Sequence, residues 1–253
     1  MGLADKVAII TGGGEGIGYA IAEGLVNAGA RVVVCGRREA VLQEAVKKLG
    51  SQADYVVGDV SDADQSREII EQTVSRYGAL HYLVNNAAVR LAGAIGQMPI
   101  EQIDASLAVN LRGPILMAHW AVPHLAQAEG SSILNVSSAS GRSPALGTGV
   151  YGATKSALIH LTRVWAAELA PQGIRVNCIS PGPTLTPAFK FIQDNFVPNL
   201  DDIAAAETVI GRVADSREMM PPALMLLDDE QSSYVTGAVL DIDGGYHMLA
   251  RRL

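Results

Sequence analysis

The chain has 253 residues and a mass of 26.5 kDa, and 49% of its residues are hydrophobic but only 5% are aromatic. This length suits one large α/β domain with an aliphatic core. The formal net charge of −7 argues against a surface for nucleic acid or for an anionic membrane. No apolar run reaches the roughly 18 residues of a membrane span. The first predicted strand follows the N-terminus without a signal peptide, so we expect a cytoplasmic protein.

Two kinds of segment alternate along the chain. Apolar, β-branched runs predict strands at 7–11, 31–35, 54–57, 82–85, 132–136, 175–179 and 239–242. Helical patterns lie between them at 17–28, 38–49, 66–77, 103–126, 151–170 and 222–227. The alternation predicts a Rossmann-type, doubly wound parallel sheet of about seven strands with helices on both faces. Since there is no linker or repeat, residues 1–253 are predicted to form a single domain.

Two local features refine this prediction. Cys35 and Cys178 lie in predicted buried strands without a neighbouring histidine cluster, which favours core packing over a disulfide or a metal site. We therefore expect no metal. Proline inside a helix costs about 3 kcal/mol. The last predicted helix should consequently begin at or near Pro221 rather than at Ser216.

A glycine-rich stretch follows the first predicted strand. Residues Thr11 to Gly18 read TGGGEGIG, and a helical pattern begins at Ile17. Such a loop lets backbone N–H groups approach a phosphate at the start of a helix, where the helix dipole favours an anion. Gly12, Gly16 and Gly18 give the spacing GxxxGxG rather than the commoner GxGxxG. In this context the stretch predicts a dinucleotide-binding loop.

Tyr151 and Lys155 stand four residues apart at the start of another helical pattern, and so lie on one face of that helix. A phenol titrates near pH ~10, and an ammonium within about 4–6 Å lowers that pKa. Ser138, thirteen residues before the tyrosine, can hold a substrate oxygen beside the phenol. The three residues predict acid–base chemistry on an alcohol or carbonyl, although a YxxxK pair alone is more often part of a surface helix.

Further motifs lie between and beyond these two sites. They are Asp59-Val60, NNAA at 85–88, Asn110, Pro181-Gly182, Thr186 and YVTG…DGG between Tyr234 and Gly245. Together and in this order, the motifs resemble those of the short-chain dehydrogenases/reductases, particularly members similar to 3-oxoacyl reductases and carbonyl reductases. The resemblance spans almost the whole chain. It implies an NAD(P)-dependent oxidoreductase that transfers a hydride between the nicotinamide and a secondary alcohol or ketone.

The resemblance assigns roles at the cofactor site. It implies that Asp59 bonds the adenine amino group, that Val60 packs on the adenine ring and that Thr186 bonds the carboxamide. Ala88 stands where the family usually has glycine, which adds one methyl group near the backbone. The full expected cofactor set is Gly12, Gly14, Glu15, Gly16, Ile17, Gly18, Arg37, Arg38, Asp59, Val60, Asn86, Ala87, Tyr151, Lys155, Pro181, Gly182 and Thr186.

The end of the second predicted strand bears on cofactor choice. An acidic residue there selects NAD, whereas an arginine accepts the 2′-phosphate of NADP. Here the strand ends in Gly36, Arg37 and Arg38, so Arg37 is the candidate for the phosphate and Arg38 for stacking on the adenine. Glu15 would repel a phosphate if it pointed inward. We expect NADP(H), with NAD(H) as the alternative.

For catalysis, the resemblance implies that Tyr151 protonates the nascent alkoxide while Ser138 polarises the carbonyl. Lys155 lowers the pKa of the tyrosine and binds the nicotinamide ribose, and Asn110 holds a water that completes a proton relay. The thirteen-residue spacing favours Ser138 over Ser137, since neighbours in a strand face opposite sides. Asn110 would otherwise be an asparagine that kinks its helix.

Substrate contacts are less defined by the sequence. Arg90, Arg142 and Ser140 lie near the predicted active site, and two inward arginines would suit an acidic substrate or a phosphopantetheine group. The alternative is that both arginines lie in solvent at the rim. The segment 183–215 carries all three phenylalanines and is the expected substrate lid, where these rings either cover an apolar substrate or dock the lid.

Other functions are compatible with some of these motifs. One is an NAD-dependent alcohol, sugar or steroid dehydrogenase that works oxidatively, and another is epimerisation or dehydration with bound NAD(P). A non-catalytic NAD(P)-sensing regulator and a nucleotide-free dehalogenase-like protein fit less well, because the catalytic residues are intact and Gly13 and Gly14 leave the loop open. Relatives pair through the long helices at 103–126 and 151–170, so we expect a homodimer or homotetramer. The substrate itself does not follow from these motifs.

Overall fold

The computed structural model describes residues 2–248, apart from the side chain of His247. Its centre is a seven-stranded sheet in the order β3-β2-β1-β4-β5-β6-β9, in which every strand is parallel to its neighbours. The strands are β1 (Val7–Thr11), β2 (Arg31–Gly36), β3 (Ala53–Val57), β4 (Tyr82–Asn85), β5 (Ser132–Val136), β6 (Arg175–Pro181) and β9 (Val239–Ile242). The predicted doubly wound parallel sheet is confirmed. The strand order reverses between β1 and β4, which opens a crevice at their carboxyl ends.

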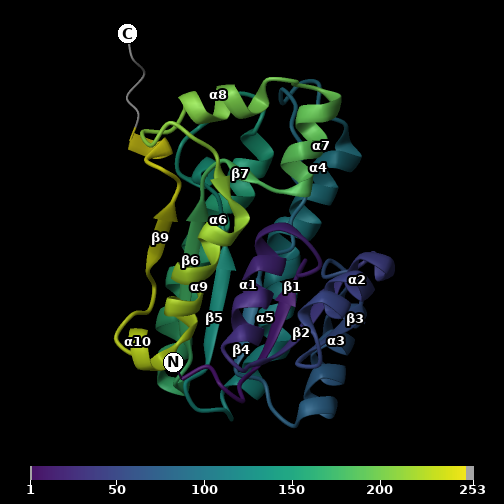
Figure 1. Cartoon of the computed structure of the whole chain (residues 1–253), viewed down its shortest axis with the longest axis vertical. Coiled ribbons are helices and arrows are strands. Elements are labelled where there is room, and N and C mark those ends of the chain that lie inside the picture. The colour runs from purple at the N-terminus through teal and green to yellow at the C-terminus, as the bar shows by residue number, and fades with distance from the viewer. Residues whose placement is uncertain (1, 249–253) are drawn as a thin grey trace.

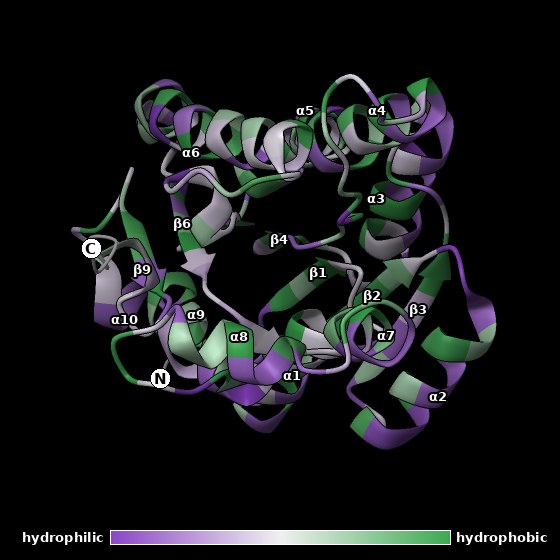
Figure 2. Ribbon diagram, turned by 90° about the horizontal axis from the view of Figure 1, so that it is seen from above, coloured by the Kyte–Doolittle hydropathy of each residue, from purple (hydrophilic) through white to green (hydrophobic). Residues whose placement is uncertain are grey.

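Helices cover both faces of the sheet, as the view from above makes plain (Figure 2). On one face lie α1 (Gly16–Asn27), α2 (Glu39–Leu49) and α9 (Met220–Leu227), and on the other α3 (Ala63–Tyr77), α5 (Gly113–Leu125) and α6 (Gly149–Leu169). Alternation along each strand supplies both layers. In β1, Ala8 and Ile10 pack toward the α1 side, whereas Ile9 packs toward the α5 side.

The helix predicted at 103–126 is present as helical backbone from Ile100 to Leu125, but its hydrogen-bond pattern changes in the middle. It consists of α4 (Ile100–Leu107), a π-helical turn at Ala108–Arg112 and then α5. A π-turn accommodates an extra residue and commonly bends a helix. The buried Asn110 lies in this turn and bonds another segment of the chain, which explains why the regular helix is interrupted there.

The predicted start of the last long helix is confirmed. A short 3-10 turn occupies Ser216–Met219, and the α-helix begins at Met220, so that Pro221 and Pro222 lie in its first turn. No intrahelical N–H bond is required at those positions.

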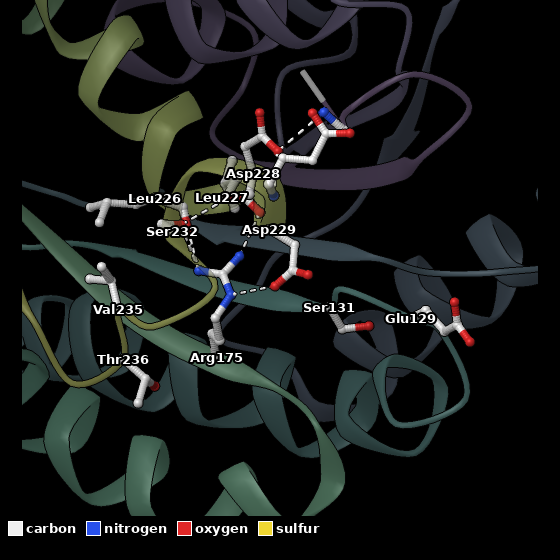
Figure 3. A network of polar contacts seen from close by, with 12 residues as sticks. Glu129, Ser131, Arg175, Leu226, Leu227, Asp228, Asp229, Ser232, Val235 and Thr236 are labelled. Atoms are coloured by element: carbon white, nitrogen blue, oxygen red, sulfur yellow. Dashed lines mark hydrogen bonds and ion pairs between the residues drawn. The ribbon is translucent and has the colours of Figure 1, made fainter.

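Arg175, at the start of β6, ties the sheet to the C-terminal helices (Figure 3). Its buried guanidinium donates to the carbonyl oxygens of Leu226 at 2.7 Å and Leu227 at 2.8 Å, and to Ser232 Oγ at 2.9 Å. An ion pair of 3.3 Å with Asp229 of α10 (Asp229–Ser232) completes the network. The cation thus satisfies carbonyl groups that the end of α9 leaves without helical partners.

The segment 183–215 lies above the carboxyl ends of the strands (Figure 1). It contains β7 (Thr184–Leu185), α7 (Pro187–Asn195), α8 (Leu200–Ala206) and β8 (Ala214–Asp215). The two short strands, which sequence patterns did not reveal, pair with each other in parallel. This pairing joins the beginning of the segment to its end. Within residues 2–248, no helix combines the length and hydropathy needed to cross a bilayer.

Candidate active site

A cavity of about 460 Å³ opens at the carboxyl ends of the strands, beneath the segment 183–215. The glycine loop, the ends of β2, β4 and β5, the start of α6 and the helices α7 and α8 all contribute to its wall. The predicted site residues that line it are Gly12, Gly14, Glu15, Gly16, Ile17, Arg37, Arg38, Asp59, Val60, Asn86, Ala87, Arg90, Ser138, Ser140, Tyr151, Lys155, Pro181, Gly182 and Thr186. Three predicted residues do not line it: Gly18, Asn110 and Arg142.

The glycine loop joins β1 to α1 in a conformation that favours glycine at two of its positions. Gly12 and Gly16 have φ of +63° and +58°, in the left-handed region. At Gly18, a Cβ atom would lie 2.5 Å from both Gly12 O and Asn86 Nδ2. Gly18 therefore acts by letting the loop pack tightly against the end of β4, although it does not reach the cavity itself.

Thr11, the last residue of β1, holds the loop and the end of β4 together. Its hydroxyl accepts hydrogen bonds from the backbone N–H groups of Asn86 and Ala87, both at 2.9 Å, and donates to Val84 O at 3.3 Å. Asn86 Nδ2 in turn donates to Thr11 O at 2.8 Å and to Gly12 O at 3.1 Å. Thr11 was not among the predicted site residues. Its position between a strand and a glycine loop could have indicated that its hydroxyl holds the loop in place.

Ser138 and Tyr151 meet inside the cavity. Tyr151 lies in the first turn of α6 and is buried, and the hydroxyl of Ser138 hydrogen-bonds to the phenol. Ser138 Oγ also accepts from the backbone N–H of Ser140 at 3.2 Å. Ser137 also lines the cavity, but its hydroxyl donates to the backbone oxygen of Lys155 at 2.8 Å. The hydroxyls of the two adjacent serines therefore bind different partners, the phenol of Tyr151 for Ser138 and the backbone of α6 for Ser137.

The electrostatics of the pair Tyr151 and Lys155 differ from the sequence expectation. Burial raises the pKa of Tyr151, while the hydrogen bond from Ser138 and the charge of Arg90 lower it only partly. Burial also lowers the pKa of Lys155 to about 8. Lys155 Nζ donates to Val136 O at 2.8 Å and lies 5.8 Å from the centroid of the Tyr151 ring. The expected lowering of the tyrosine pKa was therefore wrong in direction, because desolvation outweighs the nearby charges. Tyr151 is a neutral phenol at neutral pH.

Asn110 lies behind the cavity wall. Its Oδ1 accepts from the backbone N–H of Val89 at 2.7 Å, and its Nδ2 donates to Val89 O at 2.8 Å. Nδ2 also lies 3.4 Å from Thr154 Oγ1, and that hydroxyl donates to Tyr151 O at 2.7 Å. Asn110 thus connects the segment after β4 to the turn of α6 that carries the tyrosine.

At the end of the cavity near β2, each arginine faces a carboxylate. Arg38 forms an ion pair with Glu15, and Arg37 Nη1 lies 3.7 Å from Asp59 Oδ2. Asp59 also accepts hydrogen bonds from Ser61 N at 2.9 Å and Ser61 Oγ at 2.7 Å. Burial acts to raise the pKa of Asp59, but these bonds and the Arg37 charge lower it.

Of the two arginines considered for the substrate, only Arg90 lines the cavity, and it is exposed there. The expectation for Arg142 was wrong. Arg142 Nε forms an ion pair of 3.0 Å with Asp241 Oδ1 in β9, and the side chain lines a separate shallow depression with Ser143 and Arg163. A 3-10 turn at Ala139–Gly141 separates Ser138 from Arg142, and the Arg142 side chain lies beside β9 rather than in the cavity.

The start of the segment 183–215 is fixed against the glycine loop. Thr186 caps the N-terminus of α7 by accepting from Phe189 N at 3.1 Å, and a Cβ atom on Gly16 would lie 3.2 Å from the Thr186 methyl group. Phe189 faces the cavity, whereas Phe191 and Phe196 are exposed and contact each other edge to face at 5.9 Å. One phenylalanine of the three therefore lines the cavity.

Comparison with known proteins identifies the family. Residues 12–247 match the family model described as enoyl-(acyl carrier protein) reductase. The 3-oxoacyl-[acyl-carrier-protein] reductase FabG of Thermotoga maritima is 36% identical over 97% of this chain and 99% of its own, and the tropinone reductase-like 3 of Erythroxylum coca is 35% identical over 95% and 92%. A solved short chain dehydrogenase/reductase family protein superposes with a TM-score of 0.87 at 32% identity, covering 98% of this chain and all of its own. The chain belongs to the short-chain dehydrogenases/reductases.

As a short-chain dehydrogenase/reductase, the protein is an oxidoreductase that acts on CH–OH or carbonyl groups with NAD(P). Its cavity fits that cofactor. Glu15, the N-cap residue that precedes α1, makes no side-chain capping bond, so the N–H groups of the first turn keep their capacity to bind an anion such as a pyrophosphate. Gly14 and Gly16 line the cavity beside them, where they leave room for the pyrophosphate to approach the backbone.

Proposed function

We propose that this enzyme reduces a ketone to a secondary alcohol with NADPH. The observation that carries the proposal is the buried phenol of Tyr151, which is hydrogen-bonded to Ser138 and whose ring centroid lies 5.8 Å from Lys155 Nζ. The neutral phenol holds the proton that a carbonyl must receive to become an alcohol. Burial opposes the transfer by raising the pKa of Tyr151, and the nearby Lys155 ammonium favours it by stabilising the tyrosinate.

In this proposal the chain's own residues orient the carbonyl and supply the proton. The Ser138 hydroxyl donates a hydrogen bond to the carbonyl oxygen, and the Tyr151 hydroxyl donates its proton to that oxygen as negative charge develops on it. Lys155, with a pKa of about 8, is largely cationic at neutral pH and stabilises the tyrosinate left behind. The nicotinamide, when bound, supplies the hydride.

Further residues hold this arrangement in place. Asn110 fixes Val89 and contacts Thr154, so it is proposed to support the relay that returns a proton to Tyr151. Asp59 and Val60 are proposed to contact the adenine, Thr186 the carboxamide, and Pro181 and Gly182 the nicotinamide ring. All five of these contact residues line the same cavity as the catalytic group.

The preference for NADPH over NADH rests on Arg37 and Arg38. Both guanidinium groups lie at the cavity end near β2, where no strand-end carboxylate replaces them. Glu15, which would otherwise repel a phosphate, is engaged in an ion pair with Arg38. The looser 3.7 Å pair with Asp59 leaves Arg37, whose side chain is 63% exposed, able to turn toward a 2′-phosphate.

We also propose that residues 1–253 act as one domain whose segment 183–215 closes over the substrate. Its helices α7 and α8 contribute Phe189, Ile192, Leu200 and Ile203 to the cavity, which suits a lid that excludes water from the reaction. Pairing of two copies through α5 and α6 is the expected assembly, since Ile115 is an exposed apolar side chain of α5.

The test is to measure binding of NADPH and NADH to the purified protein, and then oxidation of each in the presence of a panel of ketones. The proposal predicts tight NADPH binding and turnover with at least one ketone class. A preference for NADH with oxidation of alcohols would support the catabolic alternative instead. Binding without turnover of any ketone or alcohol would favour the regulatory alternative and contradict this proposal.

A further inference from the structure

Arg90 occupies a distinctive position at the catalytic end of the cavity. It follows β4 and lines the same cavity as Ser138 and Tyr151. Tyr246, near the other end of the chain, lines the cavity as well. Burial raises the pKa of each tyrosine, and the positive charge of Arg90 partly lowers both. The guanidinium therefore lies close enough to the catalytic phenol for its charge to act on it.

The backbone that carries Arg90 is held firmly. Val89, the preceding residue, has both its N–H and its C=O bonded to the buried side chain of Asn110. Three residues after Arg90, Gly93 N donates to Gly147 O at 2.8 Å, and this hydrogen bond joins the loop to the segment before α6. Arg90 thus projects from a fixed point, so that binding a group with this side chain requires little ordering of the backbone.

Arg90 also lacks the carboxylate partner that other arginines around the site possess. Arg38 pairs with Glu15, Arg37 with Asp59 and Arg142 with Asp241, but within residues 2–248 no carboxylate lies at ion-pair distance from Arg90. Arg90 is exposed where it lines the cavity, and an arginine without a carboxylate partner is suited to bind an anion in bidentate fashion.

Two other charged groups line this end of the cavity, and each already has a hydrogen-bond partner within the protein. The ammonium of Lys155 is buried and donates to Val136 O. The carboxylate of Glu207, at the end of α8, hydrogen-bonds with Tyr246 and so opposes an anion on its own side of the cavity. The charges thus favour an anion beside Arg90 and disfavour one beside Glu207.

We propose that Arg90 binds an anionic group of the substrate, a carboxylate or a phosphate, and that the substrate is therefore a ketone carrying such a group a few bonds from its carbonyl. This inference rests on the proposed carbonyl reduction and names its substrate class. The neutral ester or the dephosphorylated ketone of the same skeleton would lose the charge-assisted bonds and be a poorer substrate.

The test compares matched pairs of ketones with NADPH: 3-oxobutanoate and 4-oxopentanoate against their methyl esters, and dihydroxyacetone phosphate against dihydroxyacetone. For the preferred kind of anion, we expect kcat/KM to exceed that of the neutral partner about 10- to 100-fold, the range of a charge-assisted hydrogen bond. The arm with the larger ratio distinguishes a carboxylate from a phosphate. Arg90→Met should bring that ratio close to one, and Arg90→Lys should restore part of it.

Arg163→Met is the matched control, since Arg163 is an exposed arginine that lines only the separate depression, and it should leave the ratio unchanged. Glu207→Gln, which removes the opposing charge, should raise the ratio. Equal turnover of anionic and neutral ketones, or an unchanged ratio in Arg90→Met, would overturn this inference and leave carbonyl reduction standing. Absence of turnover with every ketone and alcohol would instead overturn the proposed function, and this inference with it.

Discussion

The side-chain amide of Asn110 makes two hydrogen bonds to the backbone of Val89: Oδ1 accepts from Val89 N at 2.7 Å, and Nδ2 donates to Val89 O at 2.8 Å. The two residues are 21 positions apart, and their contact joins the π-helical turn to the segment after β4. A buried asparagine is costly unless its amide is hydrogen-bonded. This pair of hydrogen bonds therefore explains both the burial of Asn110 and the interruption of the regular α-helix around it.

Asn110→Ala tests this connection. The substitution leaves the N–H and C=O of Val89 without partners, so we expect the free energy of unfolding to fall by about 2–4 kcal/mol and kcat/KM to fall with it. Urea unfolding and steady-state kinetics measure the two effects. Thr154→Val is the matched control: it removes only the 3.4 Å contact with Asn110 and one local bond, and should cost less than about 1.5 kcal/mol. Equal effects of the two substitutions would contradict the assigned role of Asn110.

Gly18→Ala tests the tight packing of the glycine loop. A Cβ atom would lie 2.5 Å from Gly12 O and Asn86 Nδ2, and the backbone oxygen cannot move aside without displacing the loop. We expect a loss of about 1–3 kcal/mol in stability, together with an NADPH dissociation constant raised at least about tenfold. Gly96→Ala, where a Cβ atom would meet nothing within 4 Å, should change neither quantity. Unchanged NADPH affinity in Gly18→Ala would show that the loop does not need this close approach.

Arg37→Ala tests the cofactor preference. Loss of a charge-assisted contact to the 2′-phosphate should lower kcat/KM for NADPH about 10- to 100-fold, and it should change the value for NADH by less than about threefold. Glu15→Gln serves as the comparison, because it removes the only negative charge of the loop and should keep or improve the use of NADPH. A wild-type preference for NADH, or an equal loss with both cofactors in Arg37→Ala, would contradict the assignment.

Lys155→Met tests two effects of the Lys155 ammonium, one on catalysis and one on the stability of the fold. In the folded chain the pKa of Lys155 is about 8, below the ordinary value of 10.5. Below pH 8 the lysine is protonated in both the folded and unfolded states, and burying the charge disfavours folding. Between pH 8 and 10.5 only the unfolded chain holds the proton, so the contribution of Lys155 to stability becomes more favourable as the pH rises.

We therefore expect Lys155→Met to lose turnover and yet to be more stable than the wild type at pH 7, by roughly 1–3 kcal/mol. The difference in the free energy of unfolding between the two proteins should become smaller as the pH rises toward 10.5. Guanidinium unfolding of both proteins at pH 7, 8.5 and 10 measures this difference. A stability difference that does not change with pH, or a Lys155→Met protein that is less stable than the wild type at pH 7, would show that burial does not lower the pKa of Lys155.

Local patterns were sufficient to predict much of the fold and of the candidate site. Alternating apolar runs predicted the seven strands of the sheet, because burial on both faces leaves a continuous apolar signature in each strand. The thirteen-residue spacing to Tyr151 favoured Ser138 over Ser137, and the turn before α1 favours glycine at Gly12 and Gly16, where φ is positive.

What the sequence did not reveal depends on partners distant along the chain. Arg142 turns away from the cavity because Asp241, almost a hundred residues later, binds it. Glu15 is neutralised by Arg38, and nothing in the glycine motif indicates that pairing. The pKa of Tyr151 is governed by how deeply the folded chain buries it, so the spacing of Tyr151 and Lys155 alone predicted the wrong direction. Two-residue strands such as β7 leave too short a pattern to detect.

The central claim, that Tyr151 donates the proton, is tested most directly by Tyr151→Phe. Turnover of the best ketone with NADPH and the NADPH dissociation constant would be measured side by side in the wild type and the variant. The account predicts a fall in kcat of about 100- to 10,000-fold, because the proton donor is lost, with the dissociation constant within about threefold of the wild type. Turnover close to that of the wild type would contradict the role of Tyr151 and, with it, the proposed mechanism.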